Sequence, residues 1–330
     1  MILKEIQLSH FCQFHQAQRI QFASDGHNQN ITLISGPDSS NKASIIDAIL
    51  YCLYGEQSLS QKGRVPHKTI DTYVQLEFEH QKKIYTIKRI NRGKAEGQQI
   101  VDAESDTTLT IIEGSRIISK HRNPQEILEL VKSILGGETL DLFIFSSEMA
   151  EALRYMMVGQ KQGVSQRLST FLDSLGQDMR YYLKSELNTL LPRLIPKHDR
   201  LGFKEAEITD TCLIKLYNHE GISFQSLLPA CDSYVVAIAF MLALLKVLSA
   251  KLSHPIPFIM DSPFERLDAS HRKSVIEVML QEHIQWILFT SDAELQTEEA
   301  QMLSGKSAHV YTLETKDFTT TIIRTASYNI

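Results

Sequence analysis

The segment LISGPDSSNKASIIDAILYCLYGE, residues 33–56, constrains the fold more than any other part of the chain. An apolar strand leads into a turn at Gly36, and a helix begins almost directly after Lys42. This order is typical of a phosphate-binding loop, whose backbone N–H groups surround phosphates and whose lysine neutralises their charge. The segment predicts an α/β fold in which this loop follows a strand.

Two positions of this loop depart from the pattern GxxxxGK[S/T]. Asn41 replaces the glycine before Lys42, and Ala43 replaces the residue whose hydroxyl binds Mg²⁺. Asparagine tolerates a positive φ better than most residues, and Ser44 could still reach an α-phosphate. The candidate nucleotide-binding residues are Gly36, Asn41, Lys42, Ala43 and Ser44. A glycine turn, lysine and helix without any function remain the alternative.

A second segment, PIPFIMDSPFERLDASHR at 255–272, has the form of the partner motif. Apolar residues lead to Asp261 at a predicted strand end, where a Walker B aspartate holds Mg²⁺. Asp261 is therefore the candidate metal ligand. An ordinary buried strand followed by a helix capped at Asp268 or Ser270 explains this segment alone, but not both segments together. We expect Lys42 and Asp261 to lie side by side at one edge of a common sheet.

The remaining pattern predicts the order of the elements. Alternating residues predict strands over 1–90, with a hairpin that turns near His80–Lys82. Helices follow from about 125, and leucines at three- and four-residue steps between 168 and 190 predict one amphipathic helix that Pro192 ends. This helix either packs on its own domain or forms an intermolecular coiled coil. Strands and helices alternate again after 202.

Composition limits the protein class. The 330 residues carry a formal charge of −5, which argues against wholesale electrostatic capture of nucleic acid. Cys12, Cys52, Cys212 and Cys231 fall singly and no histidines cluster, which suggests reduced, buried thiols of a cytoplasmic protein and neither disulfides nor a zinc site. The apolar run at 234–248 is shorter than a membrane span and predicts a buried core helix.

The motifs together resemble the ABC-type ATPase heads of the SMC/RecF/RecN superfamily, and most closely the DndD-type proteins of DNA phosphorothioation. The matching segments run in the same order along nearly the whole chain: MILKEIQLSHF, SIIDAILYCLYGE, LFIFSSEMAEAL, LPACDSYVVAIAFMLALL, FIMDSPFERLDASHR and WILFTSDAE. The resemblance implies a two-lobed, mixed-sheet P-loop NTPase head. It divides the chain into an N-lobe at 1–155, a short helical remnant of a coiled-coil insertion at 156–201, and a C-lobe at 202–330.

The resemblance also implies what such a head does. ATP and Mg²⁺ are the implied cofactors, and a homodimer or a heteromer with another subunit of a DNA-modification, repair or phage-defence complex is the implied assembly. Related heads carry a long coiled-coil arm, but about 45 residues between Met156 and Gly202 could project only about 30 Å. The chain is either a natural armless relative or one from which the arm was deleted.

Several functional positions of the family hold other residues here. The signature serine and glycine are replaced within the segment Pro229, Ala230, Cys231 and Asp232. Ser262 stands where a general ABC head has a catalytic glutamate, and Ser291 and Asp292 stand at the histidine switch position. Proline donates no N–H and serine is no general base at neutral pH. These departures predict a head with little or no hydrolysis.

Three functions are carried forward. The first is a non-hydrolysing or weakly active head that pairs with another subunit, and the second is a slow ATPase that dimerises around ATP. The third is an accessory DNA-binding protein, because a predicted hairpin concentrates the cations Lys82, Lys83, Lys88, Arg89, Arg92 and Lys94. Lysines that guard an exposed strand edge explain the same pattern.

Overall fold

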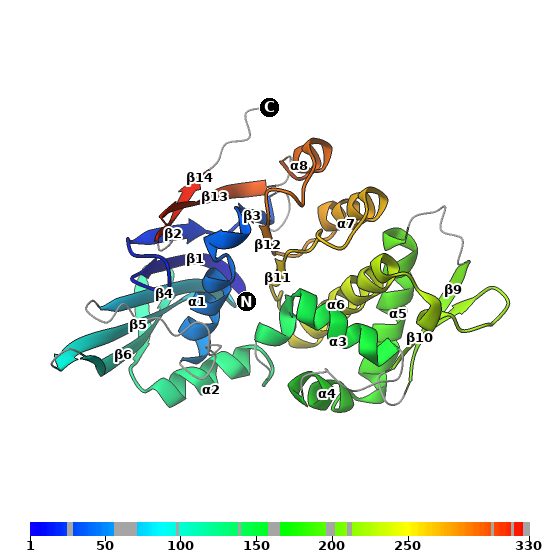
Figure 1. The fold of residues 1–330 in the computed structure, drawn as a ribbon. Coiled ribbons are helices and arrows are strands. Elements are labelled where there is room, and N and C mark those ends of the chain that lie inside the picture. Colours follow the sequence, from blue (N-terminus) through cyan, green and yellow to red (C-terminus); the bar gives the residue numbers. More distant parts are fainter. Residues whose placement is uncertain are drawn as a thin grey trace.

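The computed structural model describes residues 1–24, 29–55, 71–96, 99–137, 140–157, 166–195, 202–209, 213–304, 307–317 and 320–325. These residues form two six-stranded sheets and one two-stranded sheet, with helices beside them. In Figure 1 the N-terminal sheet lies on one side of the molecule and most of the C-terminal helices on the other, with β3, β12 and β11 between them.

The central sheet has the strand order β14-β13-β3-β12-β11-β8. All pairs in it are parallel except β13 with β14. Its strands come from both halves of the chain: β3 (Ile31–Ser35), β8 (Ile144–Phe145), β11 (Phe258–Asp261), β12 (Trp286–Thr290), β13 (Ser307–Asp317) and β14 (Thr320–Thr325). Every residue of β12 is buried, as expected for a parallel strand covered on both faces. The carboxyl ends of β3, β12 and β11 therefore meet at one edge.

The N-terminal sheet is antiparallel in the order β2-β1-β4-β5-β6-β7. Its strands are β1 (Ile2–Ser9), β2 (Gln18–Gln21), β4 (Thr72–His80), β5 (Lys83–Glu96), β6 (Gln99–Glu113) and β7 (Arg116–His121). Helices α1 (Ala43–Tyr54) and α2 (Pro124–Ile134) pack on this sheet. The predicted hairpin is confirmed: Gln81 and Lys82 link β4 to β5 with φ angles of 49° and 63°.

The C-terminal helices include one long apolar helix, α6, against which α3, α5 and α7 pack. They are α3 (Ser147–Met157), α4 (Gln166–Asp173), α5 (Gln177–Leu194), α6 (Ala230–Leu252), α7 (Ala269–Gln281) and α8 (Thr297–Ser304). By length and composition α6 could cross a membrane, but 72% of its most apolar stretch is buried inside the protein. The prediction of a buried core helix in this region is confirmed.

The predicted single helix in the middle of the chain is wrong. It is two helices, because the chain leaves α4 after Asp173 and α5 starts anew with Gly176 as its N-cap. Pro192 does not end α5 but lies inside it, and Ile195 N–H still donates to Leu191 O at 2.9 Å. A proline removes only its own N–H, so the final turn persists.

The alternative in which this leucine-rich segment packs on its own domain is confirmed. Leu183, Leu187 and Leu190 are buried in the core, and α5 lies against α6 and α7. The strands β9 (Phe203–Ile208) and β10 (Ile214–Asn218) form the small sheet that follows. Asn188 of α5 joins it by bonding both the N–H and the carbonyl of Ala206, at 2.7 and 2.8 Å.

Candidate nucleotide site

The loop after β3 closes tightly around its lysine. Lys42 is 7% exposed, and its ammonium donates to the carbonyls of Gly36 at 2.7 Å and Pro37 at 3.0 Å. Gly36 has no room for a side chain, because a Cβ there would lie 2.9 Å from Cβ of Leu313 and 3.1 Å from its carbonyl oxygen. The loop is thus compact, and the ammonium of Lys42 lies against the loop's own carbonyls.

The two substituted positions of the loop behave differently. Asn41 adopts the left-handed conformation, with φ 53° and ψ 46°, so this asparagine takes the backbone shape that usually favours glycine. Ala43 is the first residue of α1 and offers no oxygen. Ser44 is buried, and its hydroxyl interacts with the thiol of Cys12, whose pKa burial raises. Residue 41 therefore keeps the backbone conformation that glycine would have, whereas residue 43 has no hydroxyl.

Lys42 and Asp261 lie at the same edge of the central sheet. Asp261 ends β11 opposite Phe289, Thr290 of β12 lies opposite Ser35, and Gly36 N–H donates to Thr290 O at 3.2 Å. Only β12 separates the two strands, so their ends lie about 10 Å apart. Burial raises the pKa of Asp261, while the Lys42 ammonium opposes that shift. The predicted juxtaposition is present.

A carboxylate that the sequence reasoning missed joins the turns after β11 and β12. Glu294 is 6% exposed and accepts from Ser291 N–H at 2.7 Å and from Phe264 N–H at 3.2 Å. Burial raises the pKa of Glu294, although these bonds and one with Ser262 lower it. The spacing from Ser291 to Glu294 is that of a capping box, which could have drawn attention to it.

The position after Asp261 has an unusual backbone. Ser262 has φ 52°, donates its N–H to Phe289 O at 2.8 Å, and accepts at its carbonyl from the Tyr234 hydroxyl at 3.3 Å. Glu265, which is exposed, is close enough for its charge to raise the pKa of Asp261. A carboxylate therefore lies near the site even though residue 262 is not one.

A cavity of about 380 Å³ borders the same sheet edge. Its lining includes Ser35 at the end of β3 and Thr290 at the end of β12. The residues at the predicted switch position, Ser291 and Asp292, line it as well. Among the described residues, no hydrogen-bond partner lies near the buried hydroxyl of Thr290. The edge thus combines a hollow with polar groups.

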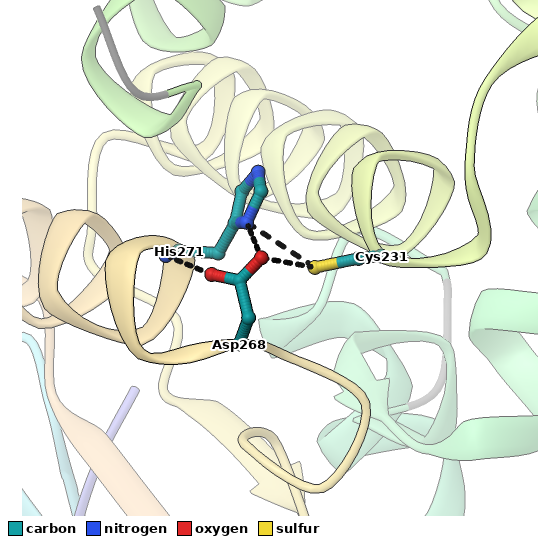
Figure 2. A group of neighbouring side chains, drawn as sticks. All are labelled: Cys231, Asp268 and His271. Atoms are coloured by element: carbon teal, nitrogen blue, oxygen red, sulfur yellow. Dashed lines mark hydrogen bonds and ion pairs between the residues drawn. The ribbon is translucent and has the colours of Figure 1, made fainter. Parts of the chain in front are cut away.

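The signature-like segment lies against α7. Pro229 is the N-cap of α6, and Pro229 and Ala230 are exposed, whereas Asp232 is buried. Figure 2 shows Cys231 pointing toward Asp268 and His271 at the start of α7. Cys231 Sγ lies 3.2 Å from Nδ1 of His271. These contacts, rather than contacts with Lys42, position the segment within one chain.

His271 and Asp268 shift each other's pKa. The contact with Cys231 and the neighbouring Asp268 raise the pKa of His271 to about 9, although burial opposes them. Burial alone would raise the pKa of Asp268, but bonds from His271 and Ser270 hold it well below its usual range. This cluster was not suggested by the sequence, because Cys231 and Asp268 are 37 residues apart.

The thiols are only partly as predicted. Cys52 is buried, and burial raises its pKa to about 12. Cys12 and Cys231 are only partly buried, so the expectation of burial is wrong for them. Cys212 lies outside the described residues.

The basic hairpin is less basic at its surface than predicted. Arg89 is 6% exposed and donates to Cys52 O at 2.9 Å and to Thr107 Oγ1 at 3.0 Å. Its guanidinium faces α1, so its prediction as a DNA contact is wrong. The edge-guarding alternative is also wrong, because β5 lies between β4 and β6.

The other cations of the hairpin differ in surroundings. Lys82 and Arg92 are exposed, and Lys88 lies over the ring of Tyr73 at 5.1 Å from its centroid. Lys83 pairs with Glu113 at 3.9 Å. Lys94 belongs to β5, but its side chain lies outside the part that the structure describes.

The residues present fit a polyphosphate better than they fit a fully liganded metal. Lys42 supplies the positive charge, and α1 begins directly after it, so the helix N-terminus adds partial positive charge. Asp261 would hold Mg²⁺, which supplies neutralisation of the phosphates when bound. Residue 43 contributes no ligand to that ion.

Comparison with known proteins gives one family match and one curated relative. A family model described as an AAA domain matches residues 5–191. The DNA double-strand break repair Rad50 ATPase of Archaeoglobus fulgidus is 30% identical over 157 residues, which cover 46% of this chain. The matched region is only 16% of that relative's length.

Solved structures resemble the whole chain. The SMC head domain from Thermotoga maritima has a TM-score of 0.59 at 16% identity and covers 99% of this chain and 100% of its own. An SmcHead bound to the C-winged helix domain of ScpA has a TM-score of 0.68 at 14% identity, with 99% of each chain covered. At these identities the likeness concerns the fold, and the predicted α/β head of the P-loop NTPase class is confirmed.

Proposed function

The chain belongs to the AAA domain family, and we propose that it is an SMC- and Rad50-like head that binds ATP at the Lys42–Asp261 edge and hydrolyses it slowly or not at all. The observation that carries the proposal is this edge itself. A phosphate loop with its lysine and a strand-end carboxylate come from segments about 220 residues apart, yet lie one strand from each other.

Low turnover follows from what the same edge lacks. Ala43 supplies no Mg²⁺ ligand, and Ser262 cannot act as a general base at neutral pH. One stabilising donor typically contributes about 2.7–4 kcal/mol to a transition state, or about 10²–10³ in rate. ATP binding depends more on the loop backbone and Lys42, which remain. We therefore expect the affinity for ATP to be reduced less than the rate of hydrolysis.

Measurements of binding and hydrolysis on the same preparation test this proposal. We expect ATP to bind with Mg²⁺ while steady-state phosphate release stays near the level of the Lys42→Ala variant. Robust hydrolysis that Lys42→Ala abolishes would contradict the low-turnover part, and an absence of any ATP affinity would contradict the nucleotide site itself.

A slow but genuine ATPase is the second candidate, and Glu265 favours it. Its carboxylate is exposed and acts electrostatically on Asp261. Glu265 could therefore orient water in place of the missing glutamate at position 262. The variant Glu265→Gln separates the two candidates. Under the second, residual hydrolysis falls while ATP affinity is kept, and under the first, the variant changes neither.

Assembly and DNA contact are further parts of the proposal. The Rad50 relative is named for DNA double-strand break repair, and one similar SMC head is bound to a domain of ScpA. By analogy we propose that this head works with a protein partner, either a second copy or another subunit, on DNA. Lys82, Lys88 and Arg92 are the candidate phosphate contacts, now without Arg89.

The finer assignments rest on the sequence resemblance. They are a DndD-type role in DNA phosphorothioation or phage defence, the accessory DNA-binding alternative, and a cytoplasmic location. We also retain the division into an N-lobe at 1–155, a helical remnant at 156–201 and a C-lobe at 202–330 as a proposal. The central sheet takes strands from both proposed lobes, so the lobes share one core.

A further inference from the structure

A cluster of three chemically different ligand groups lies at the junction of α6 and α7. Cys231 is in the first turn of α6, Asp268 is the N-cap of α7, and His271 is in the first turn of α7. Figure 2 shows the three side chains converging on one point. We propose that Cys231, Asp268 and His271 bind a zinc ion.

The spacing of the three ligand atoms suits tetrahedral zinc. Sγ of Cys231 lies 3.2 Å from Nδ1 of His271 and 3.8 Å from Oδ2 of Asp268, and Nδ1 lies 2.9 Å from Oδ2. Zinc bonds of about 2.0–2.3 Å at tetrahedral angles require separations of about 3.3–3.5 Å. Shifts of about half an ångström therefore create the site, within the freedom of three side-chain rotamers.

Asp268 is held in place before any ion arrives. Its Oδ1 accepts from His271 N–H at 3.0 Å and from Ser270 Oγ at 2.8 Å, which is the N-cap interaction of α7. Its other oxygen, Oδ2, faces the thiol and the imidazole. The cap thus uses one oxygen of the carboxylate and leaves the second for a metal.

A carboxylate also lies at the far side of the imidazole. Nε2 of His271 lies 2.9 Å from Oδ1 of Asp232, within ion-pair distance but without the angles of a hydrogen bond, which a small rotation of the ring would supply. Asp232 and His271 are 6% and 8% exposed, so this contact is well protected from water. Metal-binding histidines commonly have such a carboxylate on the other ring nitrogen, where it fixes the ring orientation and increases ligand basicity.

The ligand types and the access select zinc over other common ions. A thiolate and an imidazole are preferred by zinc, whereas Mg²⁺ and Ca²⁺ prefer oxygen alone. The Asp268 side chain is 58% exposed, so an ion can enter from solvent and a water can complete the coordination. A bound Zn²⁺ would neutralise a thiolate and a carboxylate and would tie the start of α6 to the start of α7.

Zinc binding by the whole chain tests the proposal. Tag-free protein, stripped with a chelator and then dialysed, is titrated in competition with a chromophoric zinc indicator. We expect one zinc per chain with the wild type and with Cys12→Ser, a matched control at another partly buried thiol. Cys231→Ser and His271→Gln should abolish the stoichiometric site.

Asp232→Asn distinguishes a metal site from a merely structural cluster. It leaves all three ligands in place, and we expect it to weaken zinc affinity by about 10–100-fold, the usual effect of losing an outer-shell carboxylate. Cobalt substitution should give a thiolate-to-metal charge-transfer band in the wild type that Cys231→Ser lacks. Circular dichroism of each stripped variant checks that it is folded.

Three results would overturn the proposal. The first is the absence of a stoichiometric zinc in wild-type protein, and the second is a zinc retained by folded Cys231→Ser. The third is alkylation of Cys231 by iodoacetamide at the same fast rate with and without saturating zinc, which would make the trio a reactive thiol beside a base. Protection of Cys231 by zinc supports the site.

Discussion

Lys42 and Asp261 lie on either side of a single intervening strand, and the ammonium of Lys42 counteracts the effect of burial on the pKa of the Asp261 carboxyl. The link between the two predicted half-motifs is electrostatic, because the ion pair of Lys42 is with Asp38, at 3.9 Å.

Replacement of Ala43 by serine should restore part of the metal site. The residue is exposed and begins α1, so Ala43→Ser adds a hydroxyl without displacing the core. We expect ATP affinity to become more dependent on Mg²⁺, measured as the ratio of affinities with and without the ion. Ala269→Ser, at the equivalent first position of α7, should leave that ratio unchanged. An equal response of both variants would mean that residue 43 does not face the ion.

Arg89 should be a structural residue. Arg89→Met leaves the buried oxygens of Cys52 and Thr107 without their donor, which should lower the free energy of unfolding by about 2–3 kcal/mol. Lys88→Met, next to it but on the other face of β5, should cost less than about 1 kcal/mol. Urea denaturation measures both. Similar small costs would show that Arg89 is not held as described.

Glu294 should hold the turns after β11 and β12 together. Glu294→Gln turns an amide donor toward one of two N–H groups, that of partly buried Ser291 or that of buried Phe264, and should destabilise the protein by about 1–3 kcal/mol. Asp292→Asn, exposed two residues earlier, is the control and should have little effect. The comparison is made by thermal and urea unfolding at one pH. An unchanged free energy of unfolding in Glu294→Gln would show that Glu294 does not hold the two turns together.

Acid should destabilise the protein through His80. Burial lowers the pKa of His80 from 6.5 to about 4, assisted by the neighbouring terminal ammonium and His254. The unfolded chain therefore binds more protons than the folded one between these values. Stability is full above pH 6.5 and falls as pH decreases toward 4. Urea denaturation at several pH values should show a smaller fall for His80→Phe, which keeps an aromatic ring beside Tyr85. Identical pH profiles would exclude this role.

The sequence predicted what is local in the chain. The loop with Lys42 and the strand ending at Asp261 carry their chemistry in consecutive residues, and alternation placed β4 and β5 correctly. Arg89 was misplaced because the cations were read as one run. The alternation of residues between the two faces of β5 shows the error, because Arg89 shares its strand face with Tyr85 and Ile87, which are buried.

The features that were missed depend on tertiary contacts. The first half of β6 carries Asp102, Glu104 and Ser105, so it has too little apolar alternation to predict a strand, and it forms by pairing with β5. Cys231 and His271 come together only because α6 and α7 meet at their N-terminal ends. The spacing from Ser291 to Glu294 indicates only the bond from Ser291 N–H, whereas the bond from Phe264 N–H, in the turn after β11, depends on the tertiary fold.

Calorimetric titration of ATP with Mg²⁺ into wild type, Lys42→Ala and the exposed-turn control Lys82→Ala tests the central claim most directly. We expect saturable binding to the wild type and the control, and affinity weakened by about 10–100-fold in Lys42→Ala, since a charged hydrogen bond contributes about 1.5–3 kcal/mol. Melting temperatures confirm that each variant is folded. Undetectable binding to the wild type, or equal affinity in folded Lys42→Ala, would contradict a nucleotide site at this edge.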